Sequence, residues 1–383
     1  MNRLYADHNA TSPLRAEARE AMVRALDLIG NPSSVHGEGR AAKRALEDAR
    51  ENLAATLQCH GEAIYFTSGA TEALHIALES AHAMDFKRVF ISPVEHDAVW
   101  AYAQKLWPDA HLIAVNQDGL LDMDWLSARL GSDASPALVI AQGANHEIGT
   151  LQNLNTLSSC VRASGGALMC DGVQMAGKTS VSQFAGFADW LIISSHKLGG
   201  PAGVGALIVA PGINAQPIRS GGGQERGARS GTENLAAIIG FAAAARAACD
   251  DEAIRAFSRL TGRERDSFER IVTGGGIGAK VIGTGVARLT NTSCLMVDGW
   301  EGSSQVMALD LAGAAVSAGS ACTSGKVKAS RILQACGYGP AASACAIRVS
   351  FGWSSEVGDG VKLANLYLEA SARLGRTRSA HAA

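Results

Sequence analysis

Residues 190–201 read WLIISSHKLGGP and place a lysine directly after an apolar run. The apolar run at 190–194 predicts a strand that is buried on both faces. Small and turn-forming residues surround Lys197, so the chain turns there. Lysine is normally a solvated loop residue. Ligands of α/β sheets bind at the carboxyl ends of the strands, so Lys197 is a candidate nucleophilic amine.

Similar apolar runs lie on both sides of this stretch and alternate with segments of helical periodicity. Strands are expected at 63–67, 88–92, 111–115, 137–141, 167–170, 190–194 and 205–209, and helices at 14–28, 40–57, 71–83 and 154–163. This alternation predicts an α/β fold with a mostly parallel sheet covered by helices.

The pattern changes near residue 250. A charged helix is expected at 251–271, followed by the Gly-rich stretch 273–285, strands at 292–297 and 346–351, and helices at 303–311 and 356–373. We therefore expect two domains. The large domain spans 12–250, and a smaller α+β domain comprises 1–11 and 251–383 and carries the polar loop 317–328.

Composition excludes several classes of protein. The 383 residues include 34 Lys and Arg against 36 Asp and Glu, a net charge of −2, and only 5% are aromatic, which argues against a nucleic-acid partner. No apolar run is long enough for a membrane span or a secretory signal. The eight cysteines include no C-x-x-C pair, so we expect reduced thiols, no metal site and a cytoplasmic location.

A nucleophilic lysine in a sheet suits pyridoxal phosphate (PLP), and the other needs of this cofactor can be met. Asp171 follows the expected strand 167–170 and can pair with the pyridine nitrogen. Ser68 and Thr71 lie where a strand, a glycine turn and a helix start meet, which suits a phosphate. His96 follows the strand 88–92 and can stack on the ring.

Two motifs suggest other functions. Residues 172–179, GVQMAGKT, match the P-loop pattern of NTPases, with Lys178 as the phosphate-binding lysine. However, the residues that follow are poor helix formers, and no partner aspartate for magnesium is evident. The G-x-G-x-x-A match at 274–279 opens no amphipathic helix, and we interpret it as a connecting loop.

Taken together, eight motifs resemble those of the cysteine desulfurases, which are fold-type I PLP enzymes of the class V aminotransferase family. The motifs are 5–13 (YADHNATSP), 30–37 (GNPSSVHG), 67–72 (TSGATE), 145–149 (NHEIG), 171–174 (DGVQ), 195–197 (SHK), 229–234 (RSGTEN) and 317–325 (SAGSACTSG). The last is similar to that of the group I members.

The resemblance implies a role for each matched residue. Lys197 would bind PLP covalently, Asp171 would pair with its ring nitrogen, and Gln174 would bind its phenolic oxygen. His96 would stack on the ring and act as an acid or base. The phosphate would be held by Ala70, Thr71, Ser194 and His196, joined by Thr232 from the partner of a homodimer with shared active sites. Asn145 would contact the cofactor and the substrate, L-cysteine, and Arg348 would bind the carboxylate of the substrate.

Cys322 would accept the sulfur. Its neighbours are small or polar, which does not suit a core cysteine, and nearby Lys326 and Lys328 favour a thiolate. The product persulfide would supply a sulfur-acceptor protein, such as an iron–sulfur scaffold.

Some residues depart from the family pattern. His146 stands where an asparagine is common, the segment 326–331 lacks an acidic-proline pattern, and the C-terminus lacks an acidic, aromatic tail. A selenocysteine lyase, a class V aminotransferase and, outside the family, a P-loop NTPase remain alternatives.

Overall fold

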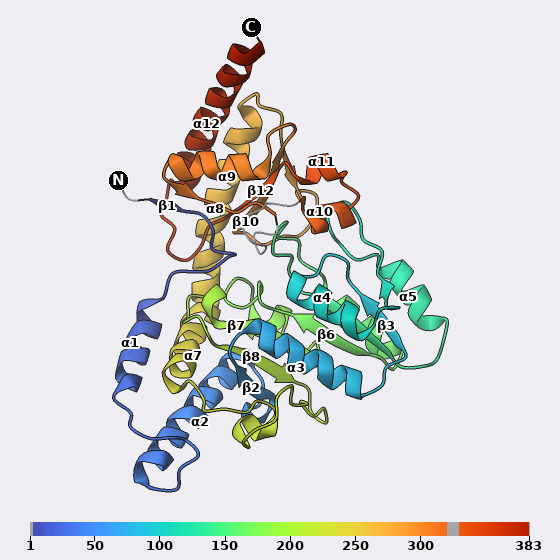
Figure 1. Ribbon diagram of the computed structural model, residues 1–383, viewed down its shortest axis with the longest axis vertical. Helices are drawn as coiled ribbons and strands as arrows, with labels where there is room; N and C mark the ends of the chain where they lie inside the picture. Colours follow the sequence, from blue (N-terminus) through green and yellow to red (C-terminus); the bar gives the residue numbers. More distant parts are fainter. Residues whose placement is uncertain (1–2, 320–328, 383) are drawn as a thin grey trace.

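A seven-stranded sheet lies at the centre of the computed structural model, which describes residues 3–319 and 329–382, with side chains as far as Arg373 (Figure 1). In order across the sheet, the strands are β2 (Ile64–Thr67), β8 (Gly205–Val209), β7 (Trp190–Ser194), β6 (Ala167–Asp171), β5 (Ala137–Gln142), β3 (Arg88–Ile91) and β4 (His111–Leu112). Strand β8 runs in the direction opposite to that of the other six strands. The predicted mostly parallel sheet is therefore confirmed.

Both faces of this sheet are covered because its strands are apolar on both sides. In β7, Leu191 and Ile193 face one core and Trp190 and Ile192 face the other, as the two-residue period of a strand requires. The first face packs against α1 (Ala16–Leu26), α2 (Gly37–Leu57), α5 (Met123–Gly131), α6 (Leu154–Ala163) and α7 (Leu235–Cys249). The second packs against α3 (Ala70–Ala83) and α4 (Asp97–Leu106).

A second, antiparallel sheet lies above the first in Figure 1. Its strands are β12 (Ala346–Ser350), β10 (Thr292–Val297) and β9 (Ala279–Ile282). One face packs against α8 (Asp251–Gly274), α9 (Gly302–Leu311) and α12 (Asp359–Ala382), and the other against the short helices α10 (Arg331–Ala335) and α11 (Pro340–Ser343).

The G-x-G match at 274–279 forms the end of α8 and the connection to β9, as interpreted from the sequence. Strand β9 itself was not predicted, because as an edge strand it pairs only with β10 and is partly exposed, so its apolar pattern is weak. Helix α12 was expected to end at residue 373 but continues to Ala382.

The N-terminal segment connects the two sheets. Strand β1 (Leu4–Tyr5) pairs with β11 (Ala314–Ala315), and Asp7 bridges Ser350 of β12. The backbone N–H groups of Ser12 and Arg15 then donate to the carbonyls of His196 and Gly199, after β7. Residues 4–15 therefore run along both parts of the molecule. Asp250 caps α8, and the division into two domains near residue 250 stays a prediction.

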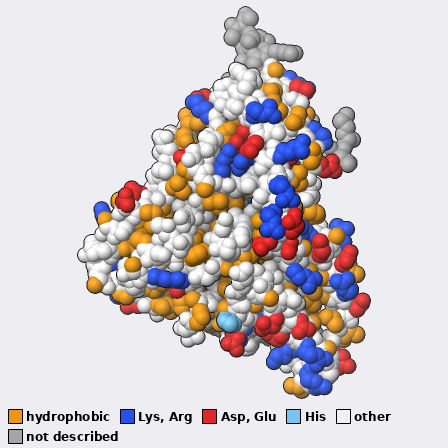
Figure 2. Space-filling view, turned by 180° about the vertical axis from the view of Figure 1, so that it is seen from behind, with side chains coloured by type: hydrophobic (Ala, Val, Ile, Leu, Met, Phe, Trp, Pro, Cys, Tyr) orange, Lys and Arg blue, Asp and Glu red, His pale blue; other side chains and the backbone are white. Residues whose placement is uncertain are grey.

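Two observations concern membrane spans in the described residues and the charge of one face of the molecule. Across the described part of the chain, no helix combines the length and apolarity that a bilayer crossing needs. On the face shown in Figure 2, Lys and Arg side chains are intermixed with Asp and Glu side chains.

Candidate functional site

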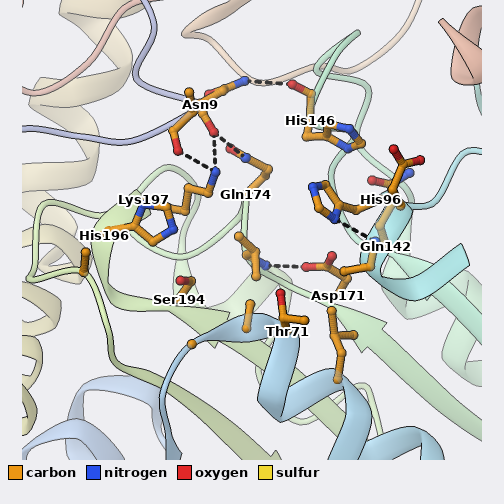
Figure 3. A pocket seen from close by; sticks show the side chains of 18 of the residues that line it. Asn9, Thr71, His96, Gln142, His146, Asp171, Gln174, Ser194, His196 and Lys197 are labelled. Carbon is orange, nitrogen blue, oxygen red and sulfur yellow. Dashed lines mark hydrogen bonds between the residues drawn. The ribbon is translucent and has the colours of Figure 1, made fainter. Parts of the chain in front are cut away.

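A cavity of about 440 Å³ lies where the N-terminal segment and β12 meet the carboxyl ends of β6 and β7. It brings together most of the predicted site residues, from both sheets (Figure 3). The predicted residues that line it are Ala70, Thr71, His96, Asp171, Gln174, Ser194, His196, Lys197 and Arg348.

Lys197 lies in a 3-10 turn, Ser195–Lys197, that begins directly after β7. Its Nζ donates to the carbonyl oxygens of Asn9 at 2.7 Å and Ala10 at 2.8 Å, so the N-terminal segment holds this amine at the cavity (Figure 3). Sequence reasoning missed Asn9 and Ala10, because a backbone carbonyl carries no side-chain signal.

Asp171 is the last residue of β6 and lies beside β7, which carries Lys197 at its end. Burial raises the pKa of this carboxyl, and it outweighs the hydrogen bond from the Val173 N–H, at 2.9 Å, and the charge of Lys197, which lower it. A protonated ring nitrogen beside the carboxyl would favour its charged form.

An anion-binding surface forms where α3 begins. Gly69 has φ +155°, a conformation that L side chains rarely adopt, and a Cβ on Gly205 would lie 2.8 Å from its carbonyl carbon. These two glycines let β8 pack closely below the N-terminus of α3, whose first N–H groups have no partners within the helix. The side chains of Thr71, Ser194 and His196 surround this helix end at the cavity (Figure 3).

His196 contributes to this surface as a neutral ring. Burial, followed by the charges of Lys197 and Lys178, lowers its pKa to about 4. Its Nδ1 lies 3.1 Å from the Thr11 hydroxyl. At neutral pH it therefore acts through hydrogen bonding and not through charge.

Two histidines form another wall of the cavity. The rings of His96 and His146 meet edge to face with centroids 4.9 Å apart (Figure 3). The Nδ1 of His96 accepts the Ala98 N–H at 3.1 Å and caps α4, so its neutral ring carries the proton on Nε2. Burial lowers the pKa of both rings. The asparagine-to-histidine departure noted in the sequence thus places a second neutral imidazole beside His96.

Arg348 projects from β12 into the cavity, and hydrogen bonds to Asp7 and to the His146 carbonyl fix its guanidinium. Its Nη2 donates to Asp7 Oδ1 at 2.8 Å and its Nη1 to the His146 carbonyl at 3.1 Å, while Ser317 Oγ donates to the other Asp7 oxygen. Each terminal nitrogen carries a second N–H, so the guanidinium can still bind a carboxylate.

Two predicted residues of the described part do not line the cavity, and a third lies outside that part. Asn145 is buried, and its side chain shapes its own loop by accepting the N–H groups of Glu147 and Ile148 and donating to the Val94 carbonyl. Thr232 is exposed. Cys322 lies outside the described residues, so its predicted role stays a prediction.

Arg331 is a site residue that sequence reasoning missed. It donates to the carbonyls of Pro93 and Glu95 and to Asp97 Oδ1, and its guanidinium lies 4.6 Å from the ring centre of Trp100. These contacts fix the loop that carries His96. A single arginine after a polar loop gave no pattern by which to find it.

The P-loop match does not form a P-loop. After Thr179 comes a 3-10 turn, Val181–Gln183, where a P-loop needs an α-helix. Lys178 is only 4% exposed, and its amine donates to Asn9 and Gln174. The glycines have packing roles instead, since a Cβ on Gly172 or Gly177 would clash with Leu191 or Leu198.

The donor set at the cavity fits pyridoxal phosphate. An amine, a carboxylate, a neutral imidazole and a helix N-terminus with hydroxyl groups all reach one space, and these four features match the aldehyde, ring nitrogen, ring face and phosphate of this cofactor.

Comparison with known proteins agrees with this match. The family model "Aminotransferase class-V", a family that uses pyridoxal phosphate, covers residues 4–359. A cysteine desulfurase of Cereibacter sphaeroides is 40% identical over 88% of this chain and 87% of its own, and cysteine desulfurase IscS 1 of Archaeoglobus fulgidus is 36% identical over 87% of each. The structure of a NifS-like protein from Rickettsia africae superposes with a TM-score of 0.87 at 28% identity, covering 96% of this chain and 99% of that one. The chain belongs to the class V aminotransferase family and, within it, to the cysteine desulfurases.

Proposed function

We propose that this protein is a PLP-dependent cysteine desulfurase that converts L-cysteine to L-alanine and transfers the sulfur to Cys322. One observation carries the proposal: Lys197 and Asp171, at the ends of neighbouring strands, share a cavity with the Arg348 guanidinium. The amine and the carboxylate suit the cofactor, and the guanidinium suits the carboxylate of an amino-acid substrate.

The residues of the cavity divide the work of holding the cofactor. Lys197 would hold it covalently, Asp171 would keep a proton on its ring nitrogen, and Gln174 would donate to its phenolic oxygen. The phosphate would lie at the N-terminus of α3, contacted by Thr71, Ser194 and His196. When bound, pyridoxal phosphate supplies an electron sink for charge that develops at the substrate Cα.

The chain itself then supplies orientation and proton movements. Arg348, fixed by Asp7, binds the substrate carboxylate. The amine of Lys197 moves the proton at the substrate Cα. His96, which is neutral at pH 7 because burial lowers its pKa, lies beside the substrate as the acid–base group.

Sulfur transfer requires a thiolate, and we assign it to Cys322. Attack of its thiolate on the substrate sulfur forms an S–S bond and breaks the Cβ–S bond. Each sulfur is oxidised by one electron and Cβ is reduced by two, so the carbon fragment takes up protons and leaves as alanine. A thiol of an acceptor protein can then take the outer sulfur.

The test is alanine release from L-cysteine by the purified holoenzyme in the presence of a thiol reductant. The wild type should release alanine, whereas Cys322→Ser should bind PLP normally but fall to background. Cys160→Ser is the matched control, since Cys160 is a partly exposed, unpaired cysteine in α6. Equal release by the wild type and Cys322→Ser would overturn the role of Cys322.

Two alternatives predict different products. A selenocysteine lyase would release alanine from selenocysteine with Cys322→Ser as fast as with the wild type. An aminotransferase would consume a 2-oxo acid and would leave the sulfur on the carbon skeleton. Either result, with no alanine from L-cysteine, would overturn the desulfurase proposal.

We further propose that the enzyme is a homodimer in which Thr232 of each chain contacts the cofactor phosphate of the other. Thr232 is exposed and away from the cavity of its own chain, as this role requires. Five of the eleven large apolar side chains exposed in the described part lie between residues 23 and 35; Ile29 is 81% exposed and Val35 is 88% exposed. A second copy of the chain would cover such an apolar surface.

Sedimentation and cofactor binding test the homodimer together. Ile29→Glu should shift the protein to monomer, and Thr232→Ala should weaken PLP binding without changing the mass of the dimer. A wild type that sediments as a monomer at micromolar concentration would overturn the proposal.

We also propose that the persulfide serves an acceptor protein for iron–sulfur cluster assembly in the cytoplasm. The seven cysteines of the described part form no disulfide, which suits a reducing compartment. Transfer of ³⁵S from labelled cysteine to a purified scaffold protein is the measurement, and loss of transfer with Cys322→Ser is the expected control.

A further inference from the structure

The proposed function leaves one buried amine of the site without a role. Lys178 is 4% exposed and does not line the cavity. A buried lysine is costly unless its amine is bound, and burial lowers the pKa of Lys178 well below its ordinary value. Its charged neighbours are Lys197, from the turn after β7, and Arg348, from β12; the titratable rings of His8 and His196 also lie within reach of its charge.

The amine of Lys178 has two acceptors, both of them amide oxygens. It donates to Asn9 Oδ1 at 2.7 Å and to Gln174 Oε1. The amine donates to both amide oxygens, so each amide turns its oxygen toward Lys178 and its NH₂ group away. The two contacts therefore link the orientation of both amides to Lys178.

Asn9 is fixed independently by its other contacts. Its Nδ2 donates to Thr292 Oγ1 at 2.9 Å and to the His146 carbonyl at 3.3 Å, and Asn291 Nδ2 donates to its Oδ1 at 3.0 Å. The amide oxygen of Asn9 therefore faces Lys178 even before the lysine is considered, and it gives the amine a rigid anchor.

Gln174, by contrast, depends on Lys178. Its Nε2 donates to the Asn9 carbonyl at 3.1 Å, which uses one of its two hydrogens, and Gln174 lines the cavity. The second hydrogen is available to a ligand only while Oε1 stays on Lys178. An amide that has lost this contact can rotate and present its oxygen instead.

We propose that Lys178 is a positioning residue that locks the Gln174 amide so that its N–H group faces the phenolic oxygen of the cofactor. This inference rests on the proposed binding of PLP at Lys197. It gives a function to the lysine of the GVQMAGKT stretch that is unrelated to nucleotide binding.

The experiment is a pH titration of the visible absorbance of the holoenzyme, which reports protonation at the bond between Lys197 and the cofactor. In Lys178→Met, the phenolic oxygen loses a fixed donor and keeps more negative charge, so the adjacent nitrogen holds its proton more strongly. The midpoint should rise by about one pH unit, a shift expected for loss of a hydrogen bond to a charged group. Lys280→Met, at a lysine whose side chain is 61% exposed, is the matched control and should not move it.

A double-mutant cycle separates positioning from a general structural effect. Gln174→Leu alone should raise the midpoint, and adding Lys178→Met should then shift it little further. If Lys178→Met yields no soluble holoenzyme, Lys178→Gln, which keeps hydrogen-bond donors but does not reach Gln174, replaces it in the same cycle.

The outcomes distinguish this inference from the proposed function. A wild type that takes up PLP without visible absorbance would overturn the proposed role of Lys197. A wild type with normal absorbance and an unchanged midpoint in Lys178→Met would overturn only the role of Lys178. The same full shift in the Gln174→Leu background would also overturn it, because Lys178 would then act by another route.

Discussion

The turns that follow β6 and β7 contain lysines that donate to the same residue but lie in different surroundings. The amine of Lys197 binds the Asn9 carbonyl and lines the cavity, whereas that of Lys178 binds the Asn9 side chain and is buried. Both turns follow neighbouring parallel strands and contain glycines. What separates the two amines is access to the cavity and not their residue type.

The two turns are packed against each other, which explains the difference in access. Gly177 has φ +73°, and a Cβ there would lie 2.9 Å from the Cβ of Leu198, in the second turn. The first turn therefore lies against the second, and its lysine is enclosed. A motif defined by glycine and lysine spacing describes this packing as well as it describes a phosphate loop, so the match alone does not decide function.

The largest effect should come from Lys197. Lys197→Ala should lower desulfurase activity by about a thousandfold or more, because it removes both the covalent attachment and a proton-transfer group. Lys178→Met should cost far less. Alanine release and cofactor absorbance measure both variants, and equal losses would contradict the distinction between the two turns.

The carboxyl group that starts the first turn, Asp171, acts on a buried neighbour, Glu95. Burial, followed by the charge of Asp171, raises the pKa of Glu95 to about 8. The folded protein therefore holds a proton that the unfolded chain releases above a pKa of about 4.5, and stability falls as pH rises from about 4.5 to about 8. Glu95→Gln removes this titration, so above pH 8 it should be more stable than the wild type by on the order of 4 kcal/mol.

Urea denaturation of the two proteins across this pH range is the measurement. Glu20→Gln serves as the control, because its side chain is 69% exposed, and its curve should run parallel to that of the wild type. A constant difference between Glu95→Gln and the wild type would mean that Glu95 does not titrate in this range.

The packing between the two turns can be tested at Gly177. Gly177→Ala should destabilise the protein by about 3 kcal/mol, since it combines a left-handed backbone with contacts to Leu198 and Ala248 that are too short. Gly186→Ala is the control, because Gly186 has φ +75° but nothing within 4 Å of an added Cβ, so it should cost only about 1 kcal/mol. If Gly177→Ala and Gly186→Ala lowered the midpoint of urea unfolding equally, close packing between the two turns would be contradicted.

The smallest effect concerns a group outside both turns. Arg331→Lys loses the forked contacts to the Pro93 and Glu95 carbonyls, so His96 should be held less firmly and kcat/KM should fall by about tenfold or less. Cofactor affinity should not change. Arg259→Lys, at a side chain that is 67% exposed, is the control. A loss of PLP binding in Arg331→Lys would contradict a role limited to the His96 loop.

The central sheet was predictable because its strands are short apolar runs between helical segments. The prediction missed elements whose sequence pattern is weak or short. Strand β9 is partly exposed at an edge, and the short helices α10 and α11 have too few turns to show a periodicity.

The candidate site also has residues that the sequence predicted and residues that it did not. Side chains that follow strands, such as Asp171 and Lys197, could be found because the ends of parallel strands meet at one edge of the sheet. Other parts of the site depend on contacts between segments far apart in the sequence. These are the Asn9 and Ala10 carbonyls, the contacts of Arg331 with the His96 loop, and the contact of Lys178 with Asn9. Asn145 belongs to a motif that was identified from the sequence, but its side chain forms hydrogen bonds within its own loop and does not reach the cavity.

The position of the N-terminal segment has a consequence for synthesis on the ribosome. In the segment 4–10, Asn9 and Ala10 bind the amine of Lys197, whereas the residues before them pair with Ala314, Ala315 and Ser350. At about 5–20 residues per second, these residues emerge roughly 15 to 70 s before the last of their partners is made. The cavity is therefore completed only when translation is almost finished, and a nascent chain that stalls earlier cannot hold its cofactor lysine in the native arrangement.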